Sequence, residues 1–192
     1  MKAARAAGVV FAMLAAASAA CGGGADENVA AQPAAQPVAP PVAPPAPAPA
    51  VPLVAHEALA ALVPNLPGWT HGPPTSATVS LPAPAAHATA TYSRGKARID
   101  LEITDTAGHP DYVGALAKIA GSAFSQKASN GYMKGTTIAG VPAVESWNHT
   151  DRLGDISLLV DRRFIIHATG TGLDRVETLK MLVEKVEIGK IK

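Results

Sequence analysis

The chain contains little of what would mark a specific chemistry. Its 192 residues include one cysteine, which excludes an internal disulfide and a cysteine-based zinc cluster. Charged residues make up 16% and aromatic residues 4%. With 16 basic and 15 acidic residues the formal net charge is +1, and removing Lys2 and Arg5 leaves 14 basic residues and a net charge of −1. Because nucleic-acid-binding proteins carry a basic footprint, we expect no nucleic-acid partner.

Sequence motifs of common enzymes are also missing. No G-x-S-x-G nucleophile elbow occurs anywhere in the chain. Gly170 and Gly172 open a dinucleotide-binding fingerprint, but Arg175 stands where the third glycine belongs. A glycine-rich turn between a strand and a helix is therefore the favoured interpretation. We expect no enzymatic activity and no cofactor, and an envelope hydrolase is the least favoured function.

The six histidines form no metal-binding pair at i, i+4 on a predicted helix. His149, Asp151 and Asp155 cluster around the turn NHTDRLGD, where a weak divalent-cation site and a polar hairpin tip are both open. The polar tip is favoured, because the loop lacks the alternating ligands and central glycine of a calcium loop. We therefore expect no metal site. His167, on a predicted buried strand, is expected to be a structural histidine with a hydrogen-bond partner.

The first twenty residues have the composition of a secretory signal. Lys2 and Arg5 provide a positive region, residues 6–17 are apolar, and residues 18–20 are the small residues Ser-Ala-Ala that suit a cleavage site. The apolar stretch is too short for a stable transmembrane span. The sequence therefore predicts a signal peptide over residues 1–20.

The single cysteine directly follows these small residues, and this arrangement resembles bacterial lipoprotein signals. The resemblance implies that the Cys21 thiol is acylated, that Cys21 becomes the first residue of the mature chain, and that the protein is anchored in the bacterial cell envelope. The family usually has leucine three residues before the cysteine, where this chain has Ser18. Gly22, in place of a retention-marking aspartate, favours the outer over the inner membrane. Plain secretion, with cleavage after Ala19 or Ala20, is the alternative.

Residues 21–53 are predicted to be a disordered tether rich in glycine, alanine and proline. Nine of the 17 prolines fall within residues 33–52, and their Ala-Pro and Pro-Pro steps exclude helix and favour polyproline II. At about 3.1 Å per residue, such a segment reaches up to about 100 Å. A docking ligand for a proline-reading partner is the alternative, but the aromatic or basic specificity residues of such ligands are missing.

Residues 54–192 are predicted to form the globular domain, and apolar stripes predict three helices in it. The first lies within residues 53–63, and the second runs over residues 110–123 with Pro110 at its first position. The third follows Leu173, where Asp174 and Glu177 have the spacing of a capping box.

Period-two alternation of apolar residues predicts the strands. A hairpin is expected over residues 87–104 with its turn at Gly95, and its solvent face carries Arg98, Asp100 and Glu102. A salt-bridged surface is favoured there over acid–base chemistry by the two carboxylates. Further strands are expected at 131–138, 143–149, 155–161 and 164–169, with another candidate at 76–81. Because the links are short, neighbouring strands must be antiparallel. The predicted fold class is α+β, a single twisted, mainly antiparallel sheet of six to seven strands with helices packed on it.

Four stretches, NLPGW, TYSRGKARIDLEITDT, TIAGVPAVESW and LLVDRRFIIHATGTG, resemble a group of uncharacterised bacterial envelope lipoproteins over residues 62–188. The element order also resembles the PsbP-like fold, an α/β/α sandwich around an antiparallel sheet. This resemblance implies a binding or assembly module, because members of that fold class tend to be such modules and not enzymes. It carries over no functional residue.

These observations together predict a membrane-anchored envelope lipoprotein that acts as a non-enzymatic binding or assembly module. Its expected partners are the membrane, through the N-terminal lipid anchor, and a protein or envelope component, bound through a sheet face or edge. The alternative is a small-ligand-binding lipoprotein with an apolar pocket between sheet and helices. Trp147, which shares a strand face with Ala143 and Glu145, is the candidate partner-binding residue, and packing under a helix is the other interpretation.

Overall fold

The computed structural model describes residues 51–80 and 83–190. The chain divides into two units, Met1–Ala46 and Pro47–Lys192, and the described residues belong to the second. The predicted signal peptide over residues 1–20, the predicted lipidation site Cys21 and most of the predicted tether over residues 21–53 lie outside the described residues. In the part that is described, no helix is both long enough and apolar enough to cross a membrane.

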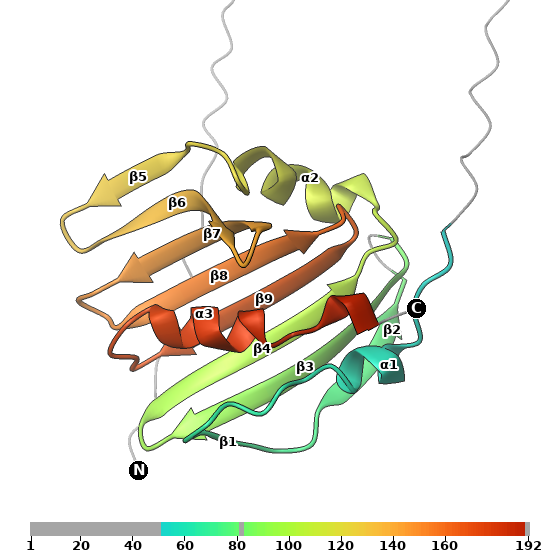
Figure 1. Ribbon diagram of the computed structural model, residues 1–192, viewed down its shortest axis with the longest axis horizontal. Helices are drawn as coiled ribbons and strands as arrows, with labels where there is room; N and C mark the ends of the chain where they lie inside the picture. Colours follow the sequence, from blue (N-terminus) through green and yellow to red (C-terminus); the bar gives the residue numbers. More distant parts are fainter. Residues whose placement is uncertain (1–50, 81–82, 191–192) are drawn as a thin grey trace, which may run out of the picture. The chain divides into compact units, whose positions relative to one another are not determined.

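One antiparallel sheet of nine strands organises the described residues (Figure 1). The strand order is β1-β3-β4-β9-β8-β7-β6-β5, and β2 pairs with β3. The strands are β1 (Thr70–His71), β2 (Thr75–Val79), β3 (Ala85–Arg94), β4 (Ala97–Asp105), β5 (Ser125–Ala128), β6 (Gly131–Ile138), β7 (Val141–Asn148), β8 (Leu153–Val160) and β9 (Phe164–Thr171).

The α+β class is confirmed, but the predicted sheet of six to seven strands is wrong. Strands β1 and β5 were not predicted, because β1 has two residues and the sequence of β5, Ser-Gln-Lys-Ala, has no apolar alternation. All four residues of β5 are exposed, so this strand is held by backbone pairing with β6 and not by burial. The added strands also change the element order that resembled a PsbP-like sandwich.

The predicted hairpin is present as β3 and β4, joined by a two-residue turn in which Gly95 has a φ of 61°. A positive φ costs little at glycine, which has no Cβ to clash with the backbone. Alternate residues of β4 (Ile99, Leu101 and Ile103) are fully or almost fully buried, and they pair with Tyr92, Ala90 and Ala88 of β3. The alternation therefore places one face of the hairpin in the core, as predicted.

Helices α1 (His56–Ala60) and α3 (Glu177–Glu184), followed by the short 3₁₀ helix η1 (Ile188–Lys190), cover that face of the sheet (Figure 1). Leu59 of α1 and Leu179 and Leu182 of α3 are completely buried in the hydrophobic cluster of the described residues. Full burial of one such side chain contributes about 1.5–3 kcal/mol. These helices are too short to be stable alone, so their packing on the sheet must hold them.

Helix α2 (Pro110–Ile119) lies at the other end of the strands and on the opposite face. A Cβ at Gly135 of β6 would lie 2.3 Å from the backbone oxygen of Ile119 and 2.6 Å from that of Ser122. Only glycine permits this approach. Gly135 and Met133 both point to the side of β6 that faces away from α1 and α3. The chain after α2 therefore covers one end of this second face of the sheet.

Two predicted helix ends are wrong. Helix α2 does not continue to residue 123, because Gly121 adopts a φ of 71° and its N–H donates to Thr136 O at 3.1 Å. Helix α3 has no side-chain cap, and the predicted capping residue Asp174 is instead paired with Arg152. Pro110 does occupy the first turn of α2, as predicted.

A buried ion pair fixes the start of the described domain. Asp105, at the end of β4, is completely buried, and both of its oxygens accept hydrogen bonds from Arg163 at 2.7 Å. The same carboxylate accepts from the backbone N–H of Val54 at 2.8 Å, while Arg163 also donates to Pro52 O at 2.8 Å. Residues 52–54 are therefore fastened to the ends of two central strands.

Candidate binding surfaces

The second face of the sheet carries a straight row of five side chains, one from each of β5, β6, β7, β8 and β9. The row follows from the register, because each residue is the direct cross-strand partner of the next. In strand order it consists of Gln126, Met133, Ser146, Asp155 and Thr169, and we call it the open-face row. Neighbouring strands are about 4.8 Å apart, so the row spans about 20 Å.

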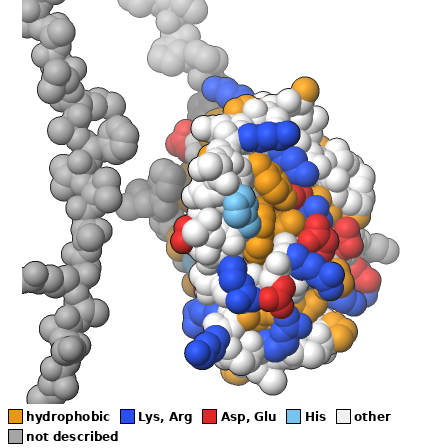
Figure 2. Space-filling model, turned by 90° about the vertical axis from the view of Figure 1, so that its left-hand side faces the viewer, with side chains coloured by type: hydrophobic (Ala, Val, Ile, Leu, Met, Phe, Trp, Pro, Cys, Tyr) orange, Lys and Arg blue, Asp and Glu red, His pale blue; other side chains and the backbone are white. Residues whose placement is uncertain are grey.

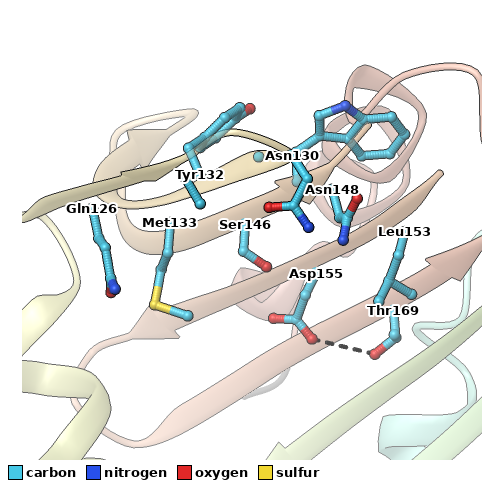
Figure 3. A pocket seen from close by; sticks show the side chains of 12 residues that line it. Gln126, Asn130, Tyr132, Met133, Ser146, Asn148, Leu153, Asp155 and Thr169 are labelled. Atoms are coloured by element: carbon cyan, nitrogen blue, oxygen red, sulfur yellow. Dashed lines mark hydrogen bonds between the residues drawn. The ribbon is translucent and has the colours of Figure 1, made fainter. Parts of the chain in front are cut away.

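The open-face row lines a pocket of about 300 Å³ that Asn148 and Leu153 also border (Figure 3). Gln126, Met133, Ser146 and Asp155 project from the same side of the sheet in Figure 3, whereas Tyr132 projects from the other side. The pocket is therefore a shallow hollow on the sheet surface, with amide, hydroxyl and carboxylate groups beside a thioether. These groups can donate and accept hydrogen bonds to a polar partner.

Asp155 is held by His167, which lies one step along the strands from the row. His167 Nε2 is 2.6 Å from Asp155 Oδ2, and Thr169 Oγ1 is 3.4 Å from both atoms. The hydrogen bond to Asp155 raises the pKa of His167, burial opposes the rise, and the charges of Asp155 and Glu102 add to it. The prediction of a partnered histidine is confirmed, but its side chain remains 40% exposed.

The His167–Asp155–Thr169 cluster does not have the geometry of a catalytic triad. In such a triad the carboxylate bonds Nδ1 of the histidine and the nucleophilic hydroxyl bonds Nε2. Here Asp155 and Thr169 both approach Nε2, so the carboxylate occupies the atom that would activate the hydroxyl. The cluster is suited to presenting a charged, hydrogen-bonding surface.

The polar surface continues across β4 and β3, where the predicted solvent face of the hairpin is confirmed. Asp100 is the cross-strand partner of Thr169, and it accepts from Arg98 Nε at 2.9 Å and Nη2 at 2.7 Å. Hydrogen bonds from Arg98 lower the pKa of Asp100, burial opposes the change, and Thr91 adds a further hydrogen bond at 2.6 Å. This is the salt-bridged surface that the sequence favours over an acid–base pair.

The opposite face contains a buried carboxylate that sequence analysis did not identify. Glu145 of β7 is 1% exposed, and it receives a hydrogen bond from Tyr132 and lies 3.0 Å from Lys180 Nζ of α3. Oε2 makes no well-directed hydrogen bond, so its contact with Lys180 is mainly ionic. Burial raises the pKa of Glu145, but Tyr132, Lys180 and Lys134 outweigh it and the net shift is downward. This cluster ties α3 to the sheet.

Trp147 lies on the helix-covered face, as the shared alternation with Ala143 and Glu145 requires. It is half-buried and packs against the hydrophobic cluster. A Cβ at Gly154, its cross-strand partner, would lie 3.2 Å from Trp147 Cε3 and 2.8 Å from Leu179 Cδ1. Its proposed partner-binding role stays a prediction, as does lipidation of Cys21, which lies outside the described residues.

The strand ends at the left of Figure 1 form a mixed surface. Figure 2 shows hydrophobic side chains in a short strip beside a histidine, with basic and acidic side chains close to the strip. His149 at this end is 3.1 Å from Ser129 O, and Asp151 accepts from Asn148 Nδ2 at 2.6 Å. Asp155, which the alternative cation site at this turn would need beside His149 and Asp151, is hydrogen-bonded to His167 instead. Within residues 51–80 and 83–190, no three metal-ligating side chains gather at one point.

A second pocket, of about 590 Å³, lies on the helix-covered side between α3 and residues 66–69. We call it the α3 groove. Its lining residues are Leu66, Pro67, Trp69, Arg94, Asp174, Arg175, Thr178, Met181, Glu184 and Lys185. Arg94 lies over the Trp69 ring with its guanidinium carbon 4.7 Å from the ring centroid. Apolar side chains therefore line a groove that also carries several charges.

No protein-family model matches the chain, and no curated protein matches it. Among solved structures, the crystal structure of an uncharacterised protein from Mycobacterium smegmatis, an Rv0999 ortholog, is similar to it. The two chains are 12% identical, the match covers 62% of this chain and 90% of that chain, and the TM-score is 0.33. A likeness at this TM-score carries no argument about fold or function.

Proposed function

We propose that this protein is a membrane-anchored lipoprotein of the bacterial cell envelope, more specifically of the outer membrane, that acts as a non-enzymatic binding or assembly module. The observation that carries the proposal is the open-face row. It offers four polar side chains and one thioether across about 20 Å of sheet, of which Ser146, Asp155 and Thr169 are half-buried and the other two are exposed. The expected signal peptide and acylated Cys21 supply the anchor, and the proline-rich tether supplies reach from the membrane.

The helices cover one face of the sheet more completely than the other, and this supports the proposal. Among the described residues, α1 and α3 pack on one face of the sheet, whereas the other face, which carries the open-face row, has α2 at one end. The uncovered part carries ion pairs and hydroxyls beside the exposed side chains of Met133 and Leu153. A partner that matches it must offer hydrogen-bonding and charged groups, as proteins and polar envelope components do.

The membrane anchor is tested at Cys21. Mass analysis of the processed chain is expected to find an acylated cysteine at its N-terminus, and fractionation is expected to place the protein with the outer membrane. The Cys21→Ser chain is expected in the soluble fraction, because it has lost acyl chains whose burial contributes about 0.8 kcal/mol per methylene. An unmodified N-terminus on the wild-type chain, or an unchanged distribution of the variant, would contradict the anchor.

The open face is tested by crosslinking in living cells. A photo-reactive amino acid at position 146, in the centre of the open-face row, is expected to yield one discrete adduct. The same group at exposed position 187, beyond α3, is expected to yield none. The second variant Asp155→Lys places a cation in the row and should abolish the adduct at position 146. Equal adducts at both positions, or insensitivity to Asp155→Lys, would refute a binding role for this face.

A small-ligand-binding lipoprotein is the second candidate function. The α3 groove favours it, since its volume of about 590 Å³ is typical of small-molecule sites. It lies between α3 and residues 66–69 and so differs from the expected position between sheet and helices. Native mass spectrometry of the protein purified from envelopes tests this candidate through the mass of a retained ligand.

A further inference from the structure

We propose that the α3 groove binds the single alkyl chain of an amphipathic anion, such as a fatty-acid carboxylate. The inference rests on the second candidate function and names its ligand class. The α3 groove and the open-face row have no residue in common. The argument depends on the shape of the groove, on the apolar residues that form it and on the balance of charges at its rim.

One stripe of α3 and the residue after it line the groove. Thr178, Met181 and Lys185 are spaced by three and four residues, so their side chains lie on one side of the helix. They extend over about 10 Å of helix axis. Leu66 and Trp69 form the facing wall and are nearly buried themselves. This geometry suits an extended alkyl chain.

One of the two exposed side chains in this stripe, Met181, is apolar. Met181 is 47% exposed although it lies between α3 residues that are buried in the core. A flexible thioether at the surface of a groove adapts to an apolar ligand. The large apolar side chains that are also exposed (Val51, Phe124, Met133 and Leu153) lie outside α3 and do not line the α3 groove.

An aliphatic ligand is favoured over a flat aromatic one by the contact between Arg94 and Trp69. The guanidinium group lies over the indole ring at 4.7 Å, and this cation–π contact already occupies one ring face. A planar ligand would have to displace Arg94 to stack there. An alkyl chain needs no ring face and can pack along Leu66 and Met181.

The charges at the rim favour an anionic headgroup. Arg94, Arg175 and Lys185 are basic, and none of the three side chains forms an ion pair with another described residue. Of the two acidic lining residues, Asp174 is already paired with Arg152, which leaves Glu184 as the opposing charge. The rim therefore has more unpaired basic than acidic side chains and can bind one carboxylate or phosphate.

The test uses the full chain with Cys21→Ser and Trp147→Phe, so that Trp69 is the one remaining tryptophan. Its fluorescence is followed during titration with decanoate, decanol and decyltrimethylammonium, all below their micelle concentrations. Decanoate is expected to bind saturably and more tightly than the other two. Octanoate should bind up to about fifteenfold more weakly than decanoate, because each methylene contributes at most about 0.8 kcal/mol.

Variants separate the groove from unspecific binding. Arg175→Gln and Lys185→Gln are each expected to weaken decanoate by up to about fivefold while leaving decanol unchanged. Met181→Glu should abolish saturable binding without loss of folding, because that side chain is exposed. Lys118→Gln on α2 is the matched control and should bind decanoate normally.

Three results would overturn the proposal. They are equal affinity for the anionic and cationic chains, unchanged binding by Met181→Glu, and binding to anionic phospholipid vesicles without binding of free decanoate. Native mass spectrometry then distinguishes the two levels of inference. A retained envelope ligand of another chemistry refutes the amphipathic anion but keeps the ligand-binding function. If no ligand is retained and decanoate does not bind, both inferences are refuted.

Discussion

The contact between Asp105 and Arg163 should dominate the stability of the domain's N-terminal boundary. Four donors converge on the two oxygens of Asp105: Oδ1 accepts from Arg163 Nε at 2.7 Å and Ala107 N at 2.9 Å, and Oδ2 accepts from Arg163 Nη2 at 2.7 Å and Val54 N at 2.8 Å. In Asp105→Asn, whichever oxygen becomes the amide nitrogen will face two donors. The substitution therefore breaks hydrogen bonds as well as removing the charge.

The magnitude follows from the burial of the pair. Removing one partner of a fully buried ion pair costs about 3–5 kcal/mol. Asp105 is 0% exposed, but the side chain of Arg163 is 26% exposed, and partial hydration of the remaining guanidinium reduces the cost. We expect a loss of about 2–4 kcal/mol in the free energy of unfolding for Asp105→Asn. At roughly 3 °C per kcal/mol for a domain of this size, the Tm should fall by about 6–12 °C.

Urea unfolding, followed by tryptophan fluorescence in the Cys21→Ser chain, measures this loss, and hydrogen exchange at the Val54 amide reports the local opening. Arg163→Met is expected to cost at least as much, since it leaves the buried carboxylate without its cation. The double variant Asp105→Asn/Arg163→Met should cost less than the two single losses combined, by more than about 1 kcal/mol. Additive losses, or a change below about 0.5 kcal/mol for Asp105→Asn, would refute the reasoning.

The pH dependence gives this prediction a second readout. Burial raises the pKa of Asp105, but its hydrogen bonds with Arg163, Val54 and Ala107, together with the Arg163 charge, produce a net lowering. A group with a lowered folded-state pKa stabilises the fold above its unfolded-state value of about 3.9, and loses that contribution as the pH falls through the folded-state value. The stability difference between wild type and Asp105→Asn should therefore be constant from pH 7 to about 4 and shrink below it.

Three further predictions concern the sheet and its helices. Gly135→Ala should destabilise the domain by more than about 2 kcal/mol, measured by urea unfolding, because its Cβ would lie 2.3 Å from a backbone oxygen at the end of α2; a neutral effect would contradict the packing. Asp155→Asn should destabilise the protein more at pH 6 than at pH 9, measured by Tm, because the raised pKa of His167 makes its ionic contribution strongest below its unfolded-state value of about 6.5; a pH-independent difference would contradict it. Lys180→Gln should reduce stability at least as much as Glu145→Gln, measured by urea unfolding, because it removes the nearest cation from a buried carboxylate, whereas Glu145→Gln leaves two lysines that are 27% and 40% exposed and stay partly hydrated; the reverse order would contradict the assigned burial.

The sequence predicted the strands whose burial is visible as alternation. Ile99, Leu101 and Ile103 alternate with polar residues, so the β4 face could be assigned before the structure was known. Strand β5 could not be predicted, since its exposed residues gain nothing from burial and are ordered by pairing with β6. Asp174 had the sequence environment of a helix cap, but Arg152, 22 residues earlier, binds it instead. At Asp174 a contact distant in sequence prevailed over a local preference, whereas β5 is ordered by backbone pairing with the strand that follows it.

Trp147 and Glu145 show the same limit within a single strand. From the sequence neither face of β7 is clearly apolar, because a glutamate stands between Ala143 and Trp147. The carboxylate is nonetheless buried, since Lys180 arrives from a helix 35 residues later and compensates its charge. A charged residue inside an otherwise apolar face therefore signals a buried ion pair when a distant helix can supply the opposite charge, and the alternation rule alone assigns such a face wrongly.

To predict the open-face row, it is not enough to know on which side of its strand each residue lies. Alternation places Ser146, Asp155 and Thr169 on polar faces, but it does not say which residues lie side by side across strands. That depends on register, which the turns and the burial of the other face set together. Here the core residues Ile156 and Ala168 are direct partners, so their neighbours Asp155 and Thr169 must also be partners on the opposite face. The packing of the apolar core thus aligns the polar row, and a partner that binds it reads an arrangement fixed by the helix-covered side.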